Sequence, residues 1–262
     1  MSALKSATAH RKIGITTQSA EISGRRLSAA AVARLAQYHE RYLRGMKGGR
    51  RIVLKACDLG GLDLAGINLS DADLPACDFT DTIFRDANLA RANLFGAFLN
   101  RTDLTNANLE RADLRGAKFE AAILTHTNLK GADMRRGEVQ GDEGRILFDP
   151  SCSFKDAALL RADMDTCKLT GADFQGARLD RVNLTGADLR DSSVDGANLS
   201  SVEMSGANCL DANLSRTAID EAPAGSAHHF RSRGAGRTPQ GNGIAEIIVQ
   251  HKPWTASTAV KA

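Results

Sequence analysis

Aromatic side chains are scarce in this chain of 262 residues, since Phe, Tyr and Trp together make up 5% of it. This scarcity argues against an ordinary mixed core built on large rings. No window of 18 or more residues is apolar throughout, so we predict no membrane-spanning helix. The N-terminus carries early basic residues but lacks the apolar stretch of a secretion signal. We therefore expect a cytoplasmic protein in a reducing compartment.

A net charge of +3 conceals a segregation of charge along the chain. Residues 1–51 hold 11 basic and 2 acidic side chains, a net charge of +9. Residues 52–220 hold 18 basic and 27 acidic side chains, a net charge of −9, and residues 221–262 carry +3. Such asymmetry is a hint about binding partners and not about the fold.

A period of five runs through the middle of the chain. Of the 34 positions taken every fifth residue from Leu54 to Ile219, 32 are Leu, Phe, Met, Val, Ile or Cys, and only Gly144 and Asp149 differ. The residue two places before each such centre is usually small, and Asp or Asn often lies between, as in Ala92-Asn93-Leu94. Side chains two apart share one face of an extended segment, so the Asp or Asn must point outward.

This pattern resembles the pentapeptide-repeat family, whose unit is Ala-(Asp/Asn)-Leu-x-x, over about 165 residues. The resemblance implies an all-β solenoid, a right-handed quadrilateral β-helix with four pentapeptide faces per coil. Positions i and i+20 should then stack at the strand spacing of about 4.8 Å. We expect one outward series to form an amide ladder and another to pair Asp71 with Arg91 and Arg111. The ladder comprises Asn68, Asn88, Asn108 and Asn128.

We divide the chain into a flexible basic N-terminus at 1–27, a capping helix and turn at 28–50, a β-helix at 51–220, and a linker with a C-terminal tail at 221–262. Ser28 is typical of a helix N-cap, and the predicted helix runs to about Lys47. It should cover the open end of the solenoid, although its arginines leave binding to nucleic acid or to an anionic surface as an alternative.

The tail has an apolar segment at 244–249 and the only Trp, Trp254. It is a candidate to cover the other end of the rod, to fold back on its side or to bind a partner. Family members that dimerise often do so through this end, so the resemblance adds a homodimer as a hypothesis.

Two irregular features are candidate protein-binding sites. The first is an interruption of the repeat at 141–150, either a loop extruded from a corner or two distorted units that stay in the wall. Insertions in solenoids often lie on a binding face. The second is a pair of aromatic residues that the frame places outward, with shielding by a neighbouring segment as the alternative. The candidate binding residues are Phe95, Phe98, Asp142, Glu143, Arg145 and Phe148.

No pattern in the sequence indicates catalysis, a cofactor or a metal. All five cysteines fall at inward positions of the repeat, which is typical of small core residues, and none has metal-ligand spacing. A disulfide between Cys57 and Cys77 fits the stacking distance but not a reducing compartment. The recurring Asp residues follow from the repeat and form no acid–base pair in a pocket.

Two functions therefore remain in view. We predict a non-catalytic scaffold or adaptor that binds another protein. The alternative is a DNA mimic that modulates a type II topoisomerase such as DNA gyrase, because the family includes quinolone-resistance proteins that resemble duplex DNA. The many arginines in the repeat disfavour the mimic, since DNA carries one unbroken negative charge per about 1.7 Å of axis. Direct nucleic-acid binding through the basic arm is disfavoured further.

Overall fold

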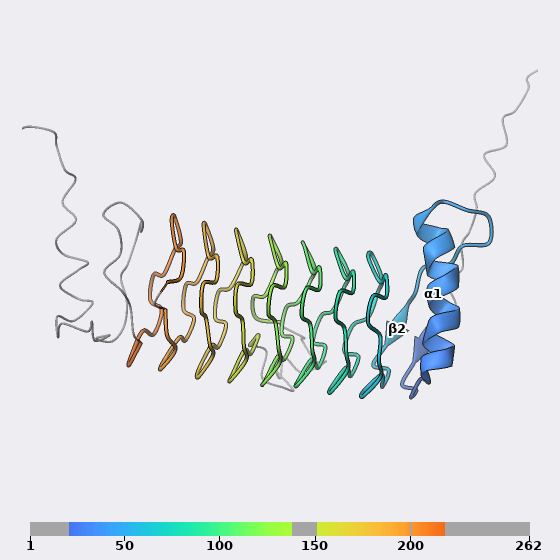
Figure 1. The fold of residues 1–262 in the computed structure, drawn as a ribbon, viewed down its shortest axis with the longest axis horizontal. Helices are drawn as coiled ribbons and strands as arrows, with labels where there is room; N and C mark the ends of the chain where they lie inside the picture. The colour runs from blue at the N-terminus through green and yellow to red at the C-terminus, as the bar shows by residue number, and fades with distance from the viewer. Residues whose placement is uncertain (1–20, 138–150, 200, 218–262) are drawn as a thin grey trace, which may run out of the picture.

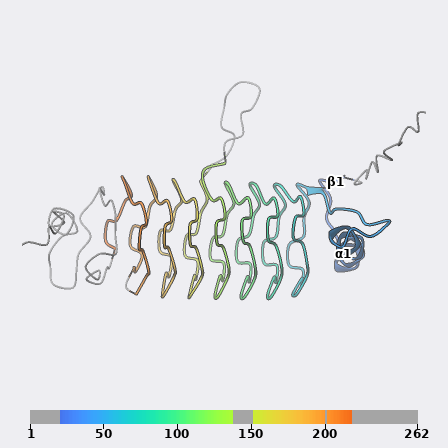
Figure 2. The same ribbon diagram turned by 90° about the horizontal axis from the view of Figure 1, so that it is seen from above.

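A coil of four short walls is the building unit of this molecule, for which a computed structural model describes residues 21–137, 151–199 and 201–217. From Val53 to Asp133, residues 20 apart pair side by side and in parallel, as Val53 does with Asp73. The coils stack into a rod along which the chain advances from one end to the other (Figure 1, Figure 2). The predicted β-solenoid is confirmed.

We name the four walls of the coil after the outward residues of the first coil: the Val53, Asp58, Asp63 and Asn68 walls. On every wall, one outward residue per coil pairs with its counterpart in the next coil. The Asp58 wall, for example, continues through Asp78, Phe98, Lys118, Ser153, Asp173, Ser193 and Asn213. Pairing on all four sides gives the coil the four faces expected from the resemblance.

The core of the rod follows from the alternation of side chains along each wall. Ala97 and Leu99 are fully buried, whereas Phe98 between them points outward. Large centres of successive coils stack on one another, and the rings of Phe119, Phe154 and Phe174 lie parallel with centroids 4.8 Å apart. This is the strand spacing itself, so backbone pairing and ring stacking reinforce each other.

The corners explain why Asp or Asn so often precedes a centre. Asp78 Oδ1 accepts the backbone N–H of Thr80 at 2.8 Å, and Asn93 Oδ1 accepts that of Phe95 at 3.1 Å. Such side-chain-to-backbone bonds start the turn. The chain then passes through the left-handed region, with φ of 62° at Gly96. Here glycine avoids a steric cost of about 1 kcal/mol or more.

The N-terminal layer begins with a short strand that the sequence pattern did not predict. β1 (Ile22–Ser23) pairs in parallel with β2 (Leu54–Lys55), and Arg26 then pairs with Asp58. The expectation of a flexible N-terminus is therefore wrong for residues 21–27, which extend the Val53 and Asp58 walls by one strand layer.

α1 (Ala29–Leu43) follows and lies across the N-terminal end of the rod (Figure 2). Ser28 Oγ accepts the N–H of Ala31 at 3.3 Å, so the predicted N-cap is confirmed. The helix ends before Lys47, because the chain turns at Gly45 with a φ of 64°. Val32 enters the hydrophobic core and is 1% exposed.

The register of the walls shows where the insertion lies in the coil. Before it, paired residues are 20 apart, but Lys118 pairs with Ser153 and not with position 138. Ser153 then pairs with Asp173, again 20 apart. Between Lys118 and Ser153 the chain is 15 residues longer than one coil. Residues 141–150 themselves lie outside the described residues.

Candidate protein-interaction surface

Several charged side chains on the walls are paired across coils. Arg91 donates two hydrogen bonds to the carboxylate of Asp71, at 2.8 and 2.6 Å, and Arg101 does the same to Asp81. The bonds from Arg91 lower the pKa of Asp71. The predicted stacking of Asp71 with Arg91 is confirmed, whereas Arg111 lies 3.7 Å from the carboxylate of Glu110. The walls therefore alternate in charge at short range.

The amide ladder on the Asn68 wall is shorter than predicted. Asn108 Nδ2 donates to Asn88 Oδ1 at 3.4 Å, and Asn128 Nδ2 donates to Asn108 Oδ1 at 3.1 Å. The amide of Asn68 instead donates to Glu40 of α1 at 3.3 Å. The first rung of the ladder thus connects the helix to the coil.

Phe98 interrupts a polar wall. The other outward residues of the Asp58 wall are Asp, Lys, Ser and Asn, whereas Phe98 is an aromatic residue that is 45% exposed. Its outward position is the one that the repeat frame predicted. The neighbouring outward residue in the next coil is Lys118, whose Nζ donates to the carbonyl oxygen of Ser151 at 2.6 Å. The Phe98 ring therefore does not belong to the hydrophobic core.

Phe95 lies at the adjacent corner and is half-buried. The guanidinium of Arg115 sits over its ring, 5.3 Å from the centroid, in a cation–π contact. Arg115 is held in place by two bonds to Asp113, at 2.8 and 2.7 Å, and these bonds raise the pKa of Arg115. The shielding that the sequence left open for Phe95 is thus supplied by one arginine from the next coil.

The gap in the described chain begins at this same corner. Arg135 stands one coil after Arg115, and Gly137 is among the last residues described before the gap. A Cβ added to Gly137 would lie 3.0 Å from the carbonyl oxygen of Arg115, so the backbone at Gly137 packs tightly on the corner of the preceding coil. Four predicted binding residues lie outside the described residues: Asp142, Glu143, Arg145 and Phe148.

We call Phe95, Phe98, Arg115, Lys118 and Arg135 the Phe95 corner. Sequence reasoning found its two aromatic residues but missed its three basic ones. One coil after Phe95 the repeat frame reaches Arg115, and one coil later it reaches Arg135, so the signal was present in the sequence. The frame also placed the insertion beside them.

The cysteines are buried, and their thiols are unreactive. All five carry free thiols, including Cys57 and Cys77. Burial raises the pKa of Cys77 and of Cys167 to about 12, which leaves almost no thiolate at neutral pH. They fill the core, as their place in the repeat indicated.

Within the described ranges, none of the helical structure has the length and hydropathy of a membrane span. The four parallel walls, paired from one coil to the next, define the molecule as a β-solenoid repeat protein. The family of pentapeptide repeats matches residues 50–86, 82–120, 102–138, 151–186 and 183–217. The chain belongs to the pentapeptide-repeat family, whose right-handed β-helix the resemblance implied. No curated protein matches this chain.

Three solved structures illustrate the likeness. HetL, a pentapeptide repeat protein involved in heterocyst differentiation regulation in the cyanobacterium Nostoc sp. strain PCC 7120, is 23% identical, with 82% of this chain and 99% of HetL covered and a TM-score of 0.36. QnrB1, a plasmid-mediated fluoroquinolone resistance protein, is 15% identical, with 82% and 90% covered and a TM-score of 0.43. A pentapeptide repeat protein of the Arabidopsis thaliana thylakoid lumen is 31% identical, with 51% and 68% covered and a TM-score of 0.30.

Proposed function

We propose that this protein is a non-catalytic scaffold that binds a partner protein through the Phe95 corner. The observation that carries the proposal is the exposed ring of Phe98 on an otherwise polar wall. Aromatic residues and arginine are enriched at protein interfaces and dominate their binding energy. At this corner, Phe95 lies under the guanidinium of Arg115, which is already oriented by Asp113, and Phe98 follows on the adjacent Asp58 wall.

The rigid rod supports this role, because a surface built on paired walls loses little conformational entropy when it binds. The insertion adds chain at the same corner. We propose that Asp142, Glu143, Arg145 and Phe148 extend the surface beyond the described wall and corner.

The test compares two exposed apolar side chains on different walls. Phe98 is 45% exposed on the Asp58 wall, and Ile123 is 42% exposed on the Asp63 wall. Proteins captured by the full chain would be quantified by mass spectrometry for the wild type, Phe98→Asp and Ile123→Asp. We expect a partner that Phe98→Asp loses and Ile123→Asp retains. A set of bound proteins unchanged by Phe98→Asp would overturn the proposal.

A second arm deletes residues 141–150 in the full chain. The proposal expects the partner that depends on Phe98 to bind this deletion at least tenfold more weakly. Unchanged affinity would remove the insertion from the surface and leave Phe98 as its centre.

The gyrase-directed DNA mimic remains the alternative, and the charge pairs weigh against it. Carboxylates such as Asp71, Asp113 and Asp133 are bonded to arginines, which reduces the negative potential that a mimic needs. Supercoiling by gyrase, with and without a quinolone, would be measured during titration with the protein. Inhibition or protection would favour the mimic over the scaffold, and no effect at excess would remove it for that enzyme.

A further inference from the structure

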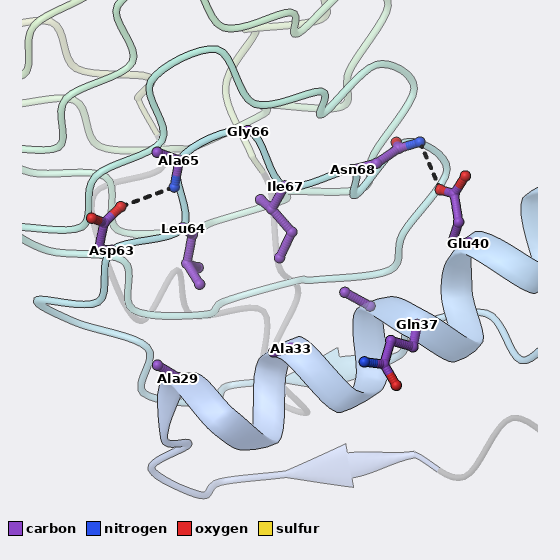
Figure 3. A pocket seen from close by; sticks show the side chains of 11 residues that line it. Ala29, Ala33, Gln37, Glu40, Asp63, Leu64, Ala65, Gly66, Ile67 and Asn68 are labelled. Atoms are coloured by element: carbon purple, nitrogen blue, oxygen red, sulfur yellow. Dashed lines mark hydrogen bonds between the residues drawn. The ribbon is translucent and has the colours of Figure 1, made fainter.

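A groove separates α1 from the first coil at the N-terminal end of the rod. Its volume is about 670 Å³, and it lies between the helix and the segment 63–68 (Figure 3). Ala29, Ala33 and Ala36 line the helix side, and Leu64 and Ile67 form part of the coil side. The short alanine side chains keep the space open, so an apolar groove runs along the Asp63 and Asn68 walls.

The backbone that borders this groove is an unpaired strand edge. Within the described part of the chain, the N–H and C=O groups of Asp63 and Asn68 and the C=O of Ala65 have no hydrogen-bond partner. In the next coil, the equivalent N–H groups of Ile83 and Asn88 both donate to the coil before, at 2.9 Å. The edge is thus a position where one strand layer is missing.

The other two walls of the same coil show what fills such an edge. Asp58 donates its N–H to Arg25 and accepts the N–H of Leu27, both at 2.9 Å. Residues 22–27 therefore complete the Val53 and Asp58 walls, and the chain then turns into α1 instead of continuing around the coil. Among the described residues, no strand of this layer pairs with the Asp63 and Asn68 walls.

Each end of the groove carries a carboxylate. The exposed carboxylate of Asp63 stands at one end and has no cation within 4 Å among the described residues, and Glu40 stands at the other end, bonded to Asn68 and Arg44. A strand that lies here would present alternate side chains to Leu64 and Ile67, and a basic side chain near Asp63 would be favoured.

We propose that this groove, the α1 groove, binds an extended segment of a partner protein by strand addition. The segment pairs with the free edge of Asp63 and Asn68, places small or β-branched apolar side chains over Leu64 and Ile67, and carries Lys or Arg toward Asp63. Main-chain bonds supply affinity and the alternate side chains supply specificity in this mode of recognition. The α1 groove is separate from the Phe95 corner, so either surface can fail without the other.

The experiment uses the full chain and a fluorescein-labelled heptapeptide in which Val and Lys alternate. Ala33→Trp fills the groove, and Ala30→Trp is its matched control, because Ala30 is exposed on the same helix but does not line the groove. We expect saturable binding by fluorescence anisotropy, weakened at least tenfold by Ala33→Trp and unchanged by Ala30→Trp. Asp63→Asn should weaken binding several-fold.

A second probe carries N-methyl groups on the backbone nitrogens of its valines and cannot pair with a strand edge. The proposal expects its binding to be lost. Equal binding of both probes, or equal effects of the two tryptophan variants, would overturn strand addition.

Absence of binding to the wild type would also overturn the proposal for a partner segment. Ile13 and Ile15 are apolar residues of the N-terminal segment. Binding that emerges only in the Ile13→Ser, Ile15→Ser double variant would then assign the groove to that segment of this chain. Self-association that Ala33→Trp abolishes in sedimentation would assign it to a second copy.

Discussion

The repeated coils and the N-terminal layer differ in how they cover the core and pair the strand edges of the neighbouring coil. Each coil after the first is completed on all four walls by the coil behind it, through parallel backbone bonds between equivalent positions. The N-terminal layer completes two walls with residues 22–27 and crosses the remaining core with α1. A helix has no free backbone groups along its side, so it covers apolar side chains but leaves strand edges unpaired.

One histidine connects the two regions. His39 of α1 is fully buried, its Nε2 lies 2.8 Å from the carbonyl oxygen of Ser70, and its Nδ1 accepts the N–H of Ile52 at 3.2 Å. The ring is therefore neutral, with its proton on Nε2 donated to Ser70. The coils are joined by many equivalent bonds, whereas the docking of the helix depends on a few unique ones.

The largest loss of stability is expected for a substitution in the core beside the insertion. Phe154 stacks on Phe119 before the gap and on Phe174 after it. Phe154→Ala should lower the free energy of unfolding by about 3–5 kcal/mol, measured by chemical denaturation. Phe98→Ala, on the surface, should change it by about 0.5 kcal/mol or less. Similar losses for the two variants would contradict the assignment of inward and outward positions.

Much of this core could be predicted from the sequence, because the repeat is local. A small residue, an outward Asp and a large centre place Ala97 and Leu99 inside and Phe98 outside without knowledge of any distant contact. β1 and His39 could not be predicted in this way, since a very short strand and a single histidine have no period. The corner beside the insertion could be located only by following the repeat frame across coils, from Phe95 to Arg135.

A smaller effect is expected at the junction of helix and coil. His39→Ala leaves the N–H of Ile52 and the carbonyl of Ser70 without their partner, which should cost about 2 kcal/mol or more. Because the coils pair among themselves, α1 should detach before the rod unfolds. Circular dichroism during denaturation should then show an early loss of helix that the wild type lacks. One cooperative transition for both signals would argue against separate stabilities.

The same residue makes the junction sensitive to pH. Burial lowers the pKa of His39 below its ordinary value of 6.5, and the charge of Arg51 lowers it further, whereas the hydrogen bond to Ser70 and the charges of Asp71 and Glu40 oppose the shift. As the pH falls below about 6.5, the unfolded chain takes up the proton first. The contribution to stability is thus complete above that pH and is lost toward the lower pKa of the folded state.

The slope of this loss cannot exceed about 1.4 kcal/mol per pH unit for one proton. Denaturation at a series of pH values should show the slope in the wild type and a smaller one in His39→Gln. Identical slopes for the two proteins would show that other groups cause the pH dependence.

The smallest effect is expected from the charge pairs on the walls. Arg91 is bonded to Asp71, but both side chains are partly exposed, at 56% and 37%. Exposed pairs contribute about 0–1 kcal/mol, so Arg91→Ala should change the free energy of unfolding by no more than this. A loss as large as that of His39→Ala would mean that the walls and not the core dominate the stability.

Hydrogen exchange of individual amides tests the central contrast most directly. On the same two walls, the N–H groups of Ile83 and Asn88 are bonded to the coil before them, and those of Asp63 and Asn68 face the α1 groove. We predict that Asp63 and Asn68 exchange at least a hundredfold faster than Ile83 and Asn88 in the native protein. Equal protection of all four amides would contradict an open strand edge beneath α1.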